Sequence, residues 1–318
     1  MKKILTAVLI INILCVGLSF SAFAKEDETV MNVYTISPYY EDLASRDVSS
    51  KIALPEGVAN EAEFATKAGE NVASNLEYCQ YISDFQYHNK TIEPEVFEKM
   101  GPNQIIIWVG HGTYMEETGD SILWIKSDFD VERYNTDEQY KDDCDNERLI
   151  EKEWQMCLTA KYIEKYCGDL TNSIVYLGPC DSAHEGNDAL AKAFLDKGAA
   201  AVIGNTYAIQ MRYGDIMQYA TISFMSEINP NTGKLYTVGE ALDKAKSIYG
   251  KNDKEAEGDF ANGAEPILFG NKDYRLELPN KVPQTGDQNN VIVYIIIAAL
   301  MITIIVAVII IMRKNKRK

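Results

Sequence analysis

Basic residues and histidine are scarce in this 318-residue chain. Lysine and arginine number 31 against 47 aspartates and glutamates, which gives a net charge of −16, and there are only three histidines. This acidity argues against nucleic acid and anionic lipid as partners, because both repel a negatively charged protein. Internal repeats and long low-complexity stretches are also absent. Apolar sequence, by contrast, is plentiful and includes a long run at each end of the chain.

The first apolar run, residues 4–20, has the composition of a secretory signal peptide. Lys2 and Lys3 make its start basic, and residues 21–24, Ser-Ala-Phe-Ala, form a small-x-small cleavage site before the charged residues begin. The run is short for a membrane span. We therefore expect residues 1–24 to be a signal peptide that is cleaved after Ala24, and an uncleaved anchor is the alternative.

The second apolar run, residues 291–312, is long enough to span a membrane, and the basic tail 313–318 should stay in the cytoplasm. A polar linker, 279–290, precedes the span. The order of pentapeptide, span and basic tail resembles the Leu-Pro-x-Thr-Gly sorting signal of Gram-positive surface proteins. A plain membrane anchor without processing is the alternative. The residues of the motif are Val282, Pro283, Gln284, Thr285 and Gly286.

The sorting-signal resemblance implies a sortase as a partner. Cleavage between Thr285 and Gly286 would link the protein to the cell wall on the extracellular face of a Gram-positive-type envelope. Val282 stands where the family has leucine, which leaves the identity of the sortase open.

Between the two ends lies one ectodomain, residues 25–278, of about 250 residues, which is enough for a sizeable core. Cleavage after Ala24 and after Thr285 would take away seven basic residues and one acidic residue and leave a net charge of about −22. Five cysteines remain after Cys15 leaves with the signal peptide. An odd number of cysteines in an exported chain indicates a free thiol.

Apolar runs that alternate with amphipathic segments predict a parallel sheet with helices on both faces. Strands are expected at 32–36, 104–109, 173–177, 199–204 and 266–269. Helices are expected at 59–79, 94–100, 149–166, 187–197, 211–228 and 238–249. The acidic segment 128–147 is expected to be an exposed insertion.

A histidine and a cysteine each follow one of the buried strands directly. His111 comes after the strand 104–109, and Cys180 comes after the strand 173–177. Active groups of parallel sheets lie just past the carboxyl ends of the strands. A thiol needs a nearby base to act as a nucleophile near neutral pH. Gly112 leaves its backbone N–H room to face a developing oxyanion together with the N–H of Cys180.

From spacing alone, a structural cysteine and a turn histidine fit these positions equally well. His184 is close to Cys180 in sequence but lies in a polar turn, which makes it a weaker candidate for the base. His88 lies in a polar segment that reads as an exposed loop.

The strand ends resemble those of caspase-like cysteine peptidases, in particular the gingipain-like and CHAT-like branches. The residues that carry the resemblance are an apolar strand ending in His-Gly (105–112), Ile-Val-Tyr-Leu-Gly-Pro-Cys-Asp-Ser (174–182), and a helix, Gly-Ala turn and strand over 189–204. Residues 267–276 are similar to the C-terminal end of the gingipain-like catalytic domain. The resemblance covers roughly residues 32–278.

The resemblance implies an α/β fold, a caspase-like α/β/α sandwich with a mostly parallel sheet. It makes His111 the general base and Cys180 the nucleophile, with the N–H groups of Gly112 and Cys180 as the oxyanion hole. Catalysis in this family requires no cofactor or metal. Members often prefer a basic residue before the cut bond, and an acidic pocket binds that residue. Pro179, where alanine is common, leaves the shape of the pocket open. No acidic residue can be assigned to that pocket from the sequence.

Two residues near the strand ends are weaker substrate-binding candidates. Asp181 adjoins the nucleophile, although a solvent-facing or helix-capping carboxylate is the simpler interpretation. Tyr207, past the third buried strand, is a candidate wall of the cleft or a core residue.

The acidic segment is a candidate calcium site, but its spacing lacks the glycine-centred pattern of an EF-hand loop, and a solvated loop is the interpretation that we prefer. Because exported proteins oxidise spare thiols, Cys144 is expected to pair with Cys157 or Cys167. Cys79 has no assigned partner.

These features together predict a secreted, surface-anchored cysteine endopeptidase that acts on protein or peptide substrates. The rival hypothesis is a catalytically silent surface binding module on the same fold. The presence of both His111 and Cys180 favours the enzyme.

Overall fold

The computed structural model describes residues 31–39, 54, 58–76, 79–82, 91–254 and 263–276. The expected signal peptide, linker, sorting motif, membrane span and basic tail lie outside these residues, as does His88, so these remain predictions. All of the described residues belong to one compact unit within Met1–Leu276. In this part of the chain, no helix is long and apolar enough to cross a membrane.

A six-stranded sheet forms the centre of the fold, in the order β12-β9-β8-β3-β1-β2. Neighbouring strands are parallel except for β12, which runs antiparallel to β9. This confirms the mostly parallel sheet predicted from the apolar runs. The strands are β1 (Met31–Ile36), β2 (Cys79–Ile82), β3 (Gln104–Trp108), β8 (Ile174–Leu177), β9 (Ala201–Asn205) and β12 (Pro266–Gly270).

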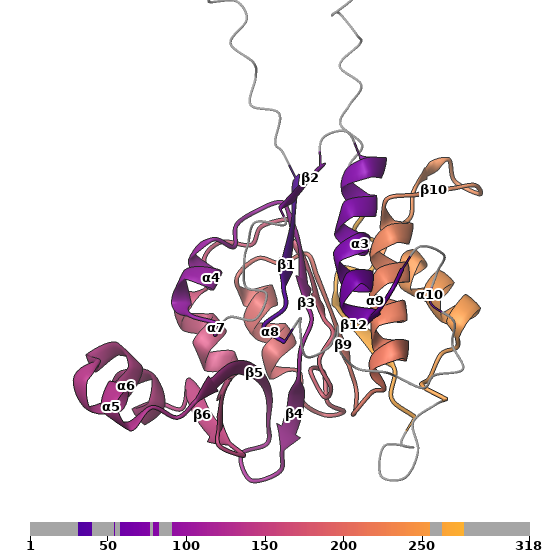
Figure 1. Ribbon diagram of the computed structural model, residues 1–318. Coiled ribbons are helices and arrows are strands. Elements are labelled where there is room, and N and C mark those ends of the chain that lie inside the picture. The colour runs from indigo at the N-terminus through magenta and orange to yellow at the C-terminus, as the bar shows by residue number, and fades with distance from the viewer. Residues whose placement is uncertain are drawn as a thin grey trace, which may run out of the picture. The chain divides into compact units, whose positions relative to one another are not determined.

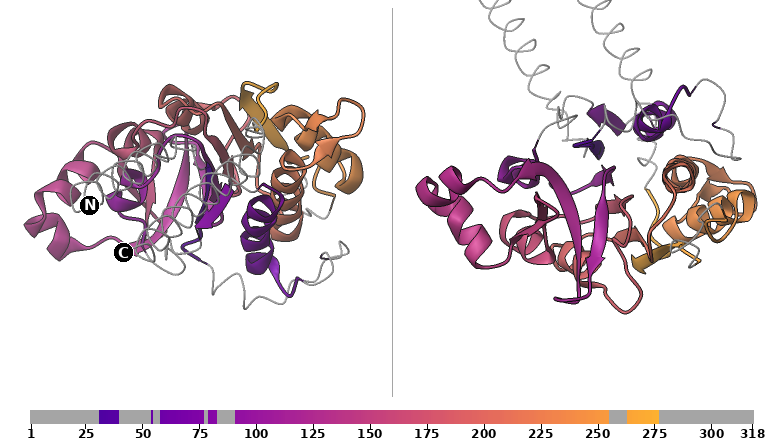
Figure 2. Two further views of the ribbon diagram at one scale, coloured as in Figure 1. Left: turned by 90° about the horizontal axis from the view of Figure 1, so that it is seen from above. Right: turned by 60° about the horizontal axis from the view of Figure 1, so that its bottom comes forward.

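Helices cover both faces of this sheet, as Figures 1 and 2 show. Strand β3 is buried along its whole length, and its side chains alternate between two cores. Ile105 and Ile107 lie in one core, and Ile106 and Trp108 lie in the other. The α/β/α sandwich is therefore confirmed. One layer holds α3 (Glu61–Asn75), α9 (Met211–Met225) and α10 (Val238–Tyr249), and the other holds α4 (Pro94–Glu98), α7 (Ala160–Tyr166) and α8 (Ala189–Asp196).

A second, antiparallel sheet follows β3 and was not predicted. Its order is β4-β5-β7-β6. Because β4 starts immediately after His111, this sheet sets the position of that residue. The strands are β4 (Gly112–Met115), β5 (Asp120–Asp128), β6 (Leu149–Lys152) and β7 (Gln155–Leu158).

The predicted helix over 149–166 is wrong in its first half. Residues 149–158 form the β6–β7 hairpin, and only α7 is helical. The hairpin turns at Glu153 and Trp154, which adopt positive φ angles of 51° and 70°. Pairing with β5 buries Met156 and Leu158, and this tertiary contact outweighs the helical spacing of the apolar residues.

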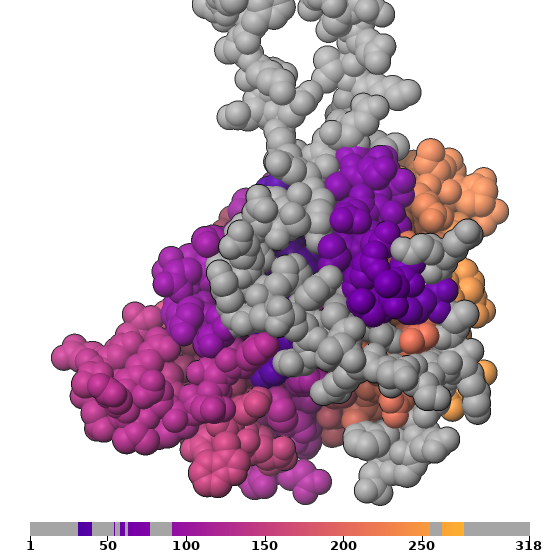
Figure 3. Space-filling view, viewed as in Figure 1, coloured from indigo at the N-terminus to yellow at the C-terminus, as the bar shows by residue number. Residues whose placement is uncertain are grey.

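The acidic segment is largely exposed, but it is not an irregular loop. It forms two short helices, α5 (Val131–Thr136) and α6 (Glu138–Asp145), whose surface is shown at the lower left of Figure 3. Asp130 and Asp137 cap them by accepting backbone N–H groups. Asp143 is buried and pairs with Arg148 and Lys165.

The chain from α9 onward differs slightly from the predicted boundaries. Helix α9 ends at Met225 rather than Ile228, and a small hairpin follows it. The strands of this hairpin are β10 (Ile228–Asn229) and β11 (Lys234–Leu235). Helix α10 begins at a capping box that Thr237 and Glu240 form, in agreement with the predicted start.

Candidate active site

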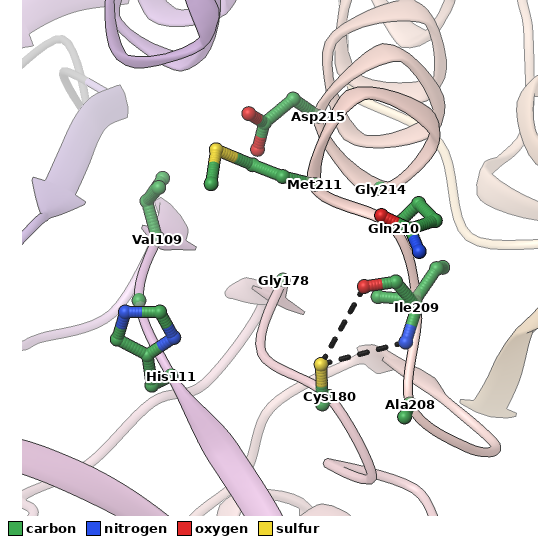
Figure 4. A pocket seen from close by; sticks show the side chains of 11 residues that line it. Val109, His111, Gly178, Cys180, Ala208, Ile209, Gln210, Met211, Gly214 and Asp215 are labelled. Atoms are coloured by element: carbon green, nitrogen blue, oxygen red, sulfur yellow. Dashed lines mark hydrogen bonds between the residues drawn. The ribbon is translucent and has the colours of Figure 1, made fainter. Parts of the chain in front are cut away.

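The structure brings His111 and Cys180 to one cavity. Strands β3 and β8 are parallel neighbours, and Trp108 is in register with Leu177. Each candidate residue comes three positions after its strand partner, so both lie at the carboxyl edge of the sheet. Figure 4 shows their side chains at the same pocket. The cavity, of about 280 Å³, is lined by Val109, Gly110, His111, Gly178, Cys180, Ala208, Ile209, Gln210, Met211, Gly214 and Asp215.

The loop that carries Cys180 is held by hydrogen bonds from the end of β9. The side-chain amide of Asn205 donates to the carbonyl oxygens of Gly178 (2.8 Å) and Pro179 (3.1 Å). The Ser182 hydroxyl donates to Leu177 O and accepts from Asn205 N. These buried bonds fix the backbone on both sides of the thiol. Asn205 and Ser182 had no sequence signal beyond their closeness to strand ends.

In this state, the Cys180 thiol interacts with the backbone of Ile209. The sulfur accepts from Ile209 N at 3.4 Å, and the thiol donates to Ile209 O at 3.6 Å. Burial raises the pKa of Cys180, the Ile209 N–H opposes this, and the carboxylates of Asp181 and Asp253 raise the pKa further. The resting cysteine is therefore a thiol rather than a thiolate near neutral pH.

Two aromatic rings hold the imidazole of His111. The ring of Tyr39 meets it edge-on with centroids 4.9 Å apart, and Trp124 lies 5.7 Å away. The Tyr39 hydroxyl contacts Gln155 Oε1 (2.9 Å) and the backbone N–H of Lys126 (3.0 Å), which ties the ring to the second sheet. Tyr39 was not predicted as a site residue. It follows β1, a neighbour of β3, and so lies at the same edge of the main sheet.

Gly112 lies in contact with the nucleophile loop. Trp124 N donates to His111 O at 3.1 Å, which continues the β4–β5 pairing by one residue beyond the Gly112–Leu123 pair. Pairs alternate along an antiparallel ladder, and the N–H of Gly112 therefore points away from β5. A Cβ at Gly112 would lie 2.6 Å from Cys180 O and 2.9 Å from Pro179 Cβ. Only glycine permits this approach of the two backbones.

An acidic side chain that the sequence did not single out lines the same cavity. Asp215 lies in the second turn of α9 and is only 7% exposed. Figure 4 shows its carboxylate on the cavity side of the helix, near Met211. The preceding segment is fixed by Gln210 N, which donates to Asp253 Oδ2 at 2.7 Å. The cavity therefore combines a thiol, an imidazole and a buried carboxylate.

The two weaker substrate-binding candidates are placed elsewhere. Neither Asp181 nor Tyr207 is among the described residues that line this cavity. Asp181 Oδ1 lies 3.0 Å from His184 Nδ1, and the Tyr207 hydroxyl bonds to Glu185. Tyr207 and His184 instead line a second, wider cavity of about 690 Å³.

The expected disulfide of Cys144 with Cys157 or Cys167 is wrong, because all four described cysteines other than Cys79 are free. Cys157 is on β7 and Cys167 follows α7, in different cores. Burial raises the pKa of Cys157 to about 12 and that of Cys167 to about 11. Both thiols are buried in the cores, whereas Cys180 is partly exposed and lines the cavity.

The calcium hypothesis finds no support among the described residues, which contain no group of three or more His, Cys, Asp or Glu arranged to hold a metal ion. In the acidic segment, Asp142 and Asp143 pair instead with Arg148 and Lys165. Calcium binding stays the less favoured alternative of the sequence analysis.

Among known proteins, no family model matches the chain, and no curated protein matches it. Among solved structures, the chain is similar to the Arg-specific cysteine proteinase gingipain R, with a TM-score of 0.44 and 11% sequence identity. The match covers 78% of this chain and 48% of that chain, so this chain spans about half the length of the solved protein.

Proposed function

We propose that the protein is a cysteine endopeptidase with His111 as the general base and Cys180 as the nucleophile. The observation that carries the proposal is the single cavity at the carboxyl edge of β3 and β8, which both side chains line. Hydrogen bonds hold the backbone on both sides of the thiol, and an aromatic ring packs against the imidazole. These are the components that nucleophilic acyl transfer requires.

The proposed reaction has two halves. His111 takes the Cys180 proton as the sulfur attacks the peptide carbonyl, and the N–H groups of Gly112 and Cys180 bind the oxygen as it becomes negative. The imidazolium then protonates the leaving amine, and the C–N bond breaks. In the second half, His111 takes a proton from water as its oxygen attacks the thioester, the C–S bond breaks to release the acid, and the imidazolium returns the proton to the Cys180 sulfur.

Peptide cleavage tests the proposal directly. Incubation of the purified protein with a mixture of peptides, followed by mass spectrometry of new ends, should show cleavage that is absent in the Cys180→Ala variant. Cys157→Ala is the matched control, since that thiol is buried away from the cavity. Equal cleavage by the Cys180→Ala variant would contradict the proposal and leave the silent binding module as the better hypothesis.

The resting thiol gives a pH prediction. Because the pKa of Cys180 is raised, the thiolate is scarce below the raised pKa and increases as the pH rises through it. Alkylation of Cys180 by iodoacetamide in the free protein should therefore have a midpoint above the ordinary range of cysteine. A midpoint well below that range would show a preformed thiolate–imidazolium pair instead.

The buried carboxylate of Asp215, which lines the cavity, supports a preference for a basic residue before the cut bond of the substrate. Asp215 is buried at the cavity and therefore screened poorly by solvent, so its charge should favour an arginine or lysine side chain of the substrate. Asp215→Asn keeps the size of the side chain and removes the charge. We expect kcat/KM for substrates with arginine at this position to fall by about 10²-fold, as for the loss of one partner of a buried charge pair.

The control for this experiment is a substrate with a neutral residue at the same position, whose cleavage by Asp215→Asn should be little changed. Asp188→Asn, which removes a charge from an exposed loop position, serves as the matched variant. If kcat/KM fell equally for both substrates, Asp215 would maintain the structure of the cavity rather than recognise the charge of the substrate.

We also propose that the peptidase acts outside the cell, tethered by the C-terminal segment. The support is the order of signal peptide, sorting motif, apolar run and basic tail in the sequence. Release of the protein from cells by a cell-wall-degrading enzyme, but not by detergent, would agree with sortase processing. Release by detergent alone would indicate a plain membrane anchor.

A further inference from the structure

Three side chains outside the cavity lining join the Cys180 loop to strand β4. Asp181 Oδ1 lies 3.0 Å from His184 Nδ1, which is the donor because an ionised carboxylate only accepts. The His184 ring stacks on the ring of Tyr114, with centroids 3.8 Å apart and planes 4° from parallel. We call Tyr114, Asp181 and His184 the Asp181 clamp.

The Asp181 clamp also contacts the backbone of β4. Tyr114 pairs with Ser121 in the ladder two positions from the Gly112–Leu123 pair, so its N–H points off the same edge as that of Gly112. Burial raises the pKa of the Asp181 carboxyl, and the contacts with His184 and with the backbone N–H of Tyr114 oppose this rise. One free edge of β4 therefore faces the nucleophile loop with two N–H groups, at Gly112 and at Tyr114.

The charge of Asp181 is unfavourable beside the nucleophile. Its backbone has a φ of +53°, in the left-handed region that glycine, asparagine and aspartate adopt more readily than other residues. Its charge also raises the pKa of the neighbouring Cys180 thiol and so opposes formation of the nucleophile. The charge therefore opposes activity, whereas the contact with His184 and β4 joins the nucleophile loop to the second sheet.

We propose that Asp181 is a positioning residue that sets the oxyanion site, with His184 orienting its carboxylate. By holding Tyr114, Asp181 fixes the edge of β4 and thereby the separation of the Gly112 and Cys180 N–H groups. This inference rests on the proposed peptidase function. Oxyanion contacts strengthen as the transition state forms, so the clamp should act on kcat more than on KM.

The test compares Asp181→Gly with Asp181→Asn. Both residues accommodate the left-handed backbone, but only asparagine keeps an acceptor for Tyr114 and His184. We expect kcat of Asp181→Gly to fall on the order of 10- to 100-fold with little change in KM, since small misplacements have effects of this size. Asp181→Asn should recover part of the loss, and Asp188→Asn should match the wild type.

Alkylation of Cys180 by iodoacetamide provides the second readout, because this reaction does not use the oxyanion site. Its rate at neutral pH should be no slower in Asp181→Gly than in the wild type, since the charge that opposes the thiolate is gone. Slower turnover combined with undiminished alkylation supports the clamp. If turnover and alkylation slowed by similar factors, the Cys180 loop would be disordered in the variant and the clamp proposal would be overturned.

The same experiment separates the two proposals. If the wild type cleaves peptides and Asp181→Gly cleaves them with unchanged kcat, the clamp is wrong and the peptidase function stands. If the wild type does not cleave at all while Cys180 is alkylated normally, the proposed function fails, and the clamp fails with it.

Discussion

Removal of the imidazole in His111→Ala is expected to lower kcat/KM for peptide cleavage by about 10²- to 10⁴-fold, the range for loss of a general base. The expectation is strong here because the pKa of Cys180 is raised, so the thiol depends on a base to give up its proton. Steady-state cleavage of one peptide by wild type and variant measures the effect. Exogenous imidazole should restore part of the rate if the space left by His111 admits it.

His184→Ala is the comparison that identifies the base. His184 bonds to Asp181 and does not line the cavity. The activity of His184→Ala should therefore fall less than that of His111→Ala, by the amount expected for the Asp181 clamp. If His184→Ala lost more activity than His111→Ala, the assignment of the base would have to be reversed.

The Gly112→Ala variant is expected to lower kcat by about 10²- to 10³-fold, comparable with the loss of an oxyanion donor. A methyl group at this position would lie 2.6 Å from the carbonyl oxygen of Cys180, so the two backbones must separate. The resulting shift moves the Gly112 N–H away from the carbonyl of the substrate. Stopped-flow or steady-state kinetics with thermal unfolding of the same variant separate this effect from loss of folding.

Gly101→Ala is the matched control for that substitution. A Cβ there would meet only Gln104 Nε2, at 3.9 Å, which is an ordinary contact. Its activity should equal that of the wild type. Wild-type turnover by Gly112→Ala would show that the close approach of the two backbones has no role in catalysis.

The main sheet and the two candidate catalytic residues could be predicted because both depend on short, local patterns. A run such as residues 104–108 is apolar at every position, which is typical of a strand buried on both faces, and the structure buries all five side chains. The residues directly after two such neighbouring strands must then share one edge of the sheet. His111 and Cys180 are the residues at these two positions, and the structure places both at one cavity.

The supporting parts of the site could not be predicted because they depend on tertiary contacts. The β6–β7 hairpin turns at Glu153 and Trp154, whereas the usual sequence signal for such a turn contains glycine or asparagine. Asp215 is one of many acidic residues, and only the packing of α9 against the sheet edge places it at the cavity. The stacking of Tyr114 on His184 joins segments about 70 residues apart in the chain, beyond any local pattern.

The most direct test of the central claim is labelling with a peptidyl acyloxymethyl ketone that ends in arginine, followed by mapping of the modified residue. We expect a single adduct at Cys180 in the wild type, formed through attack by the thiolate, and no adduct in Cys180→Ala or His111→Ala. An adduct at another cysteine, or undiminished labelling of Cys180 in His111→Ala, would contradict the pairing of these two residues.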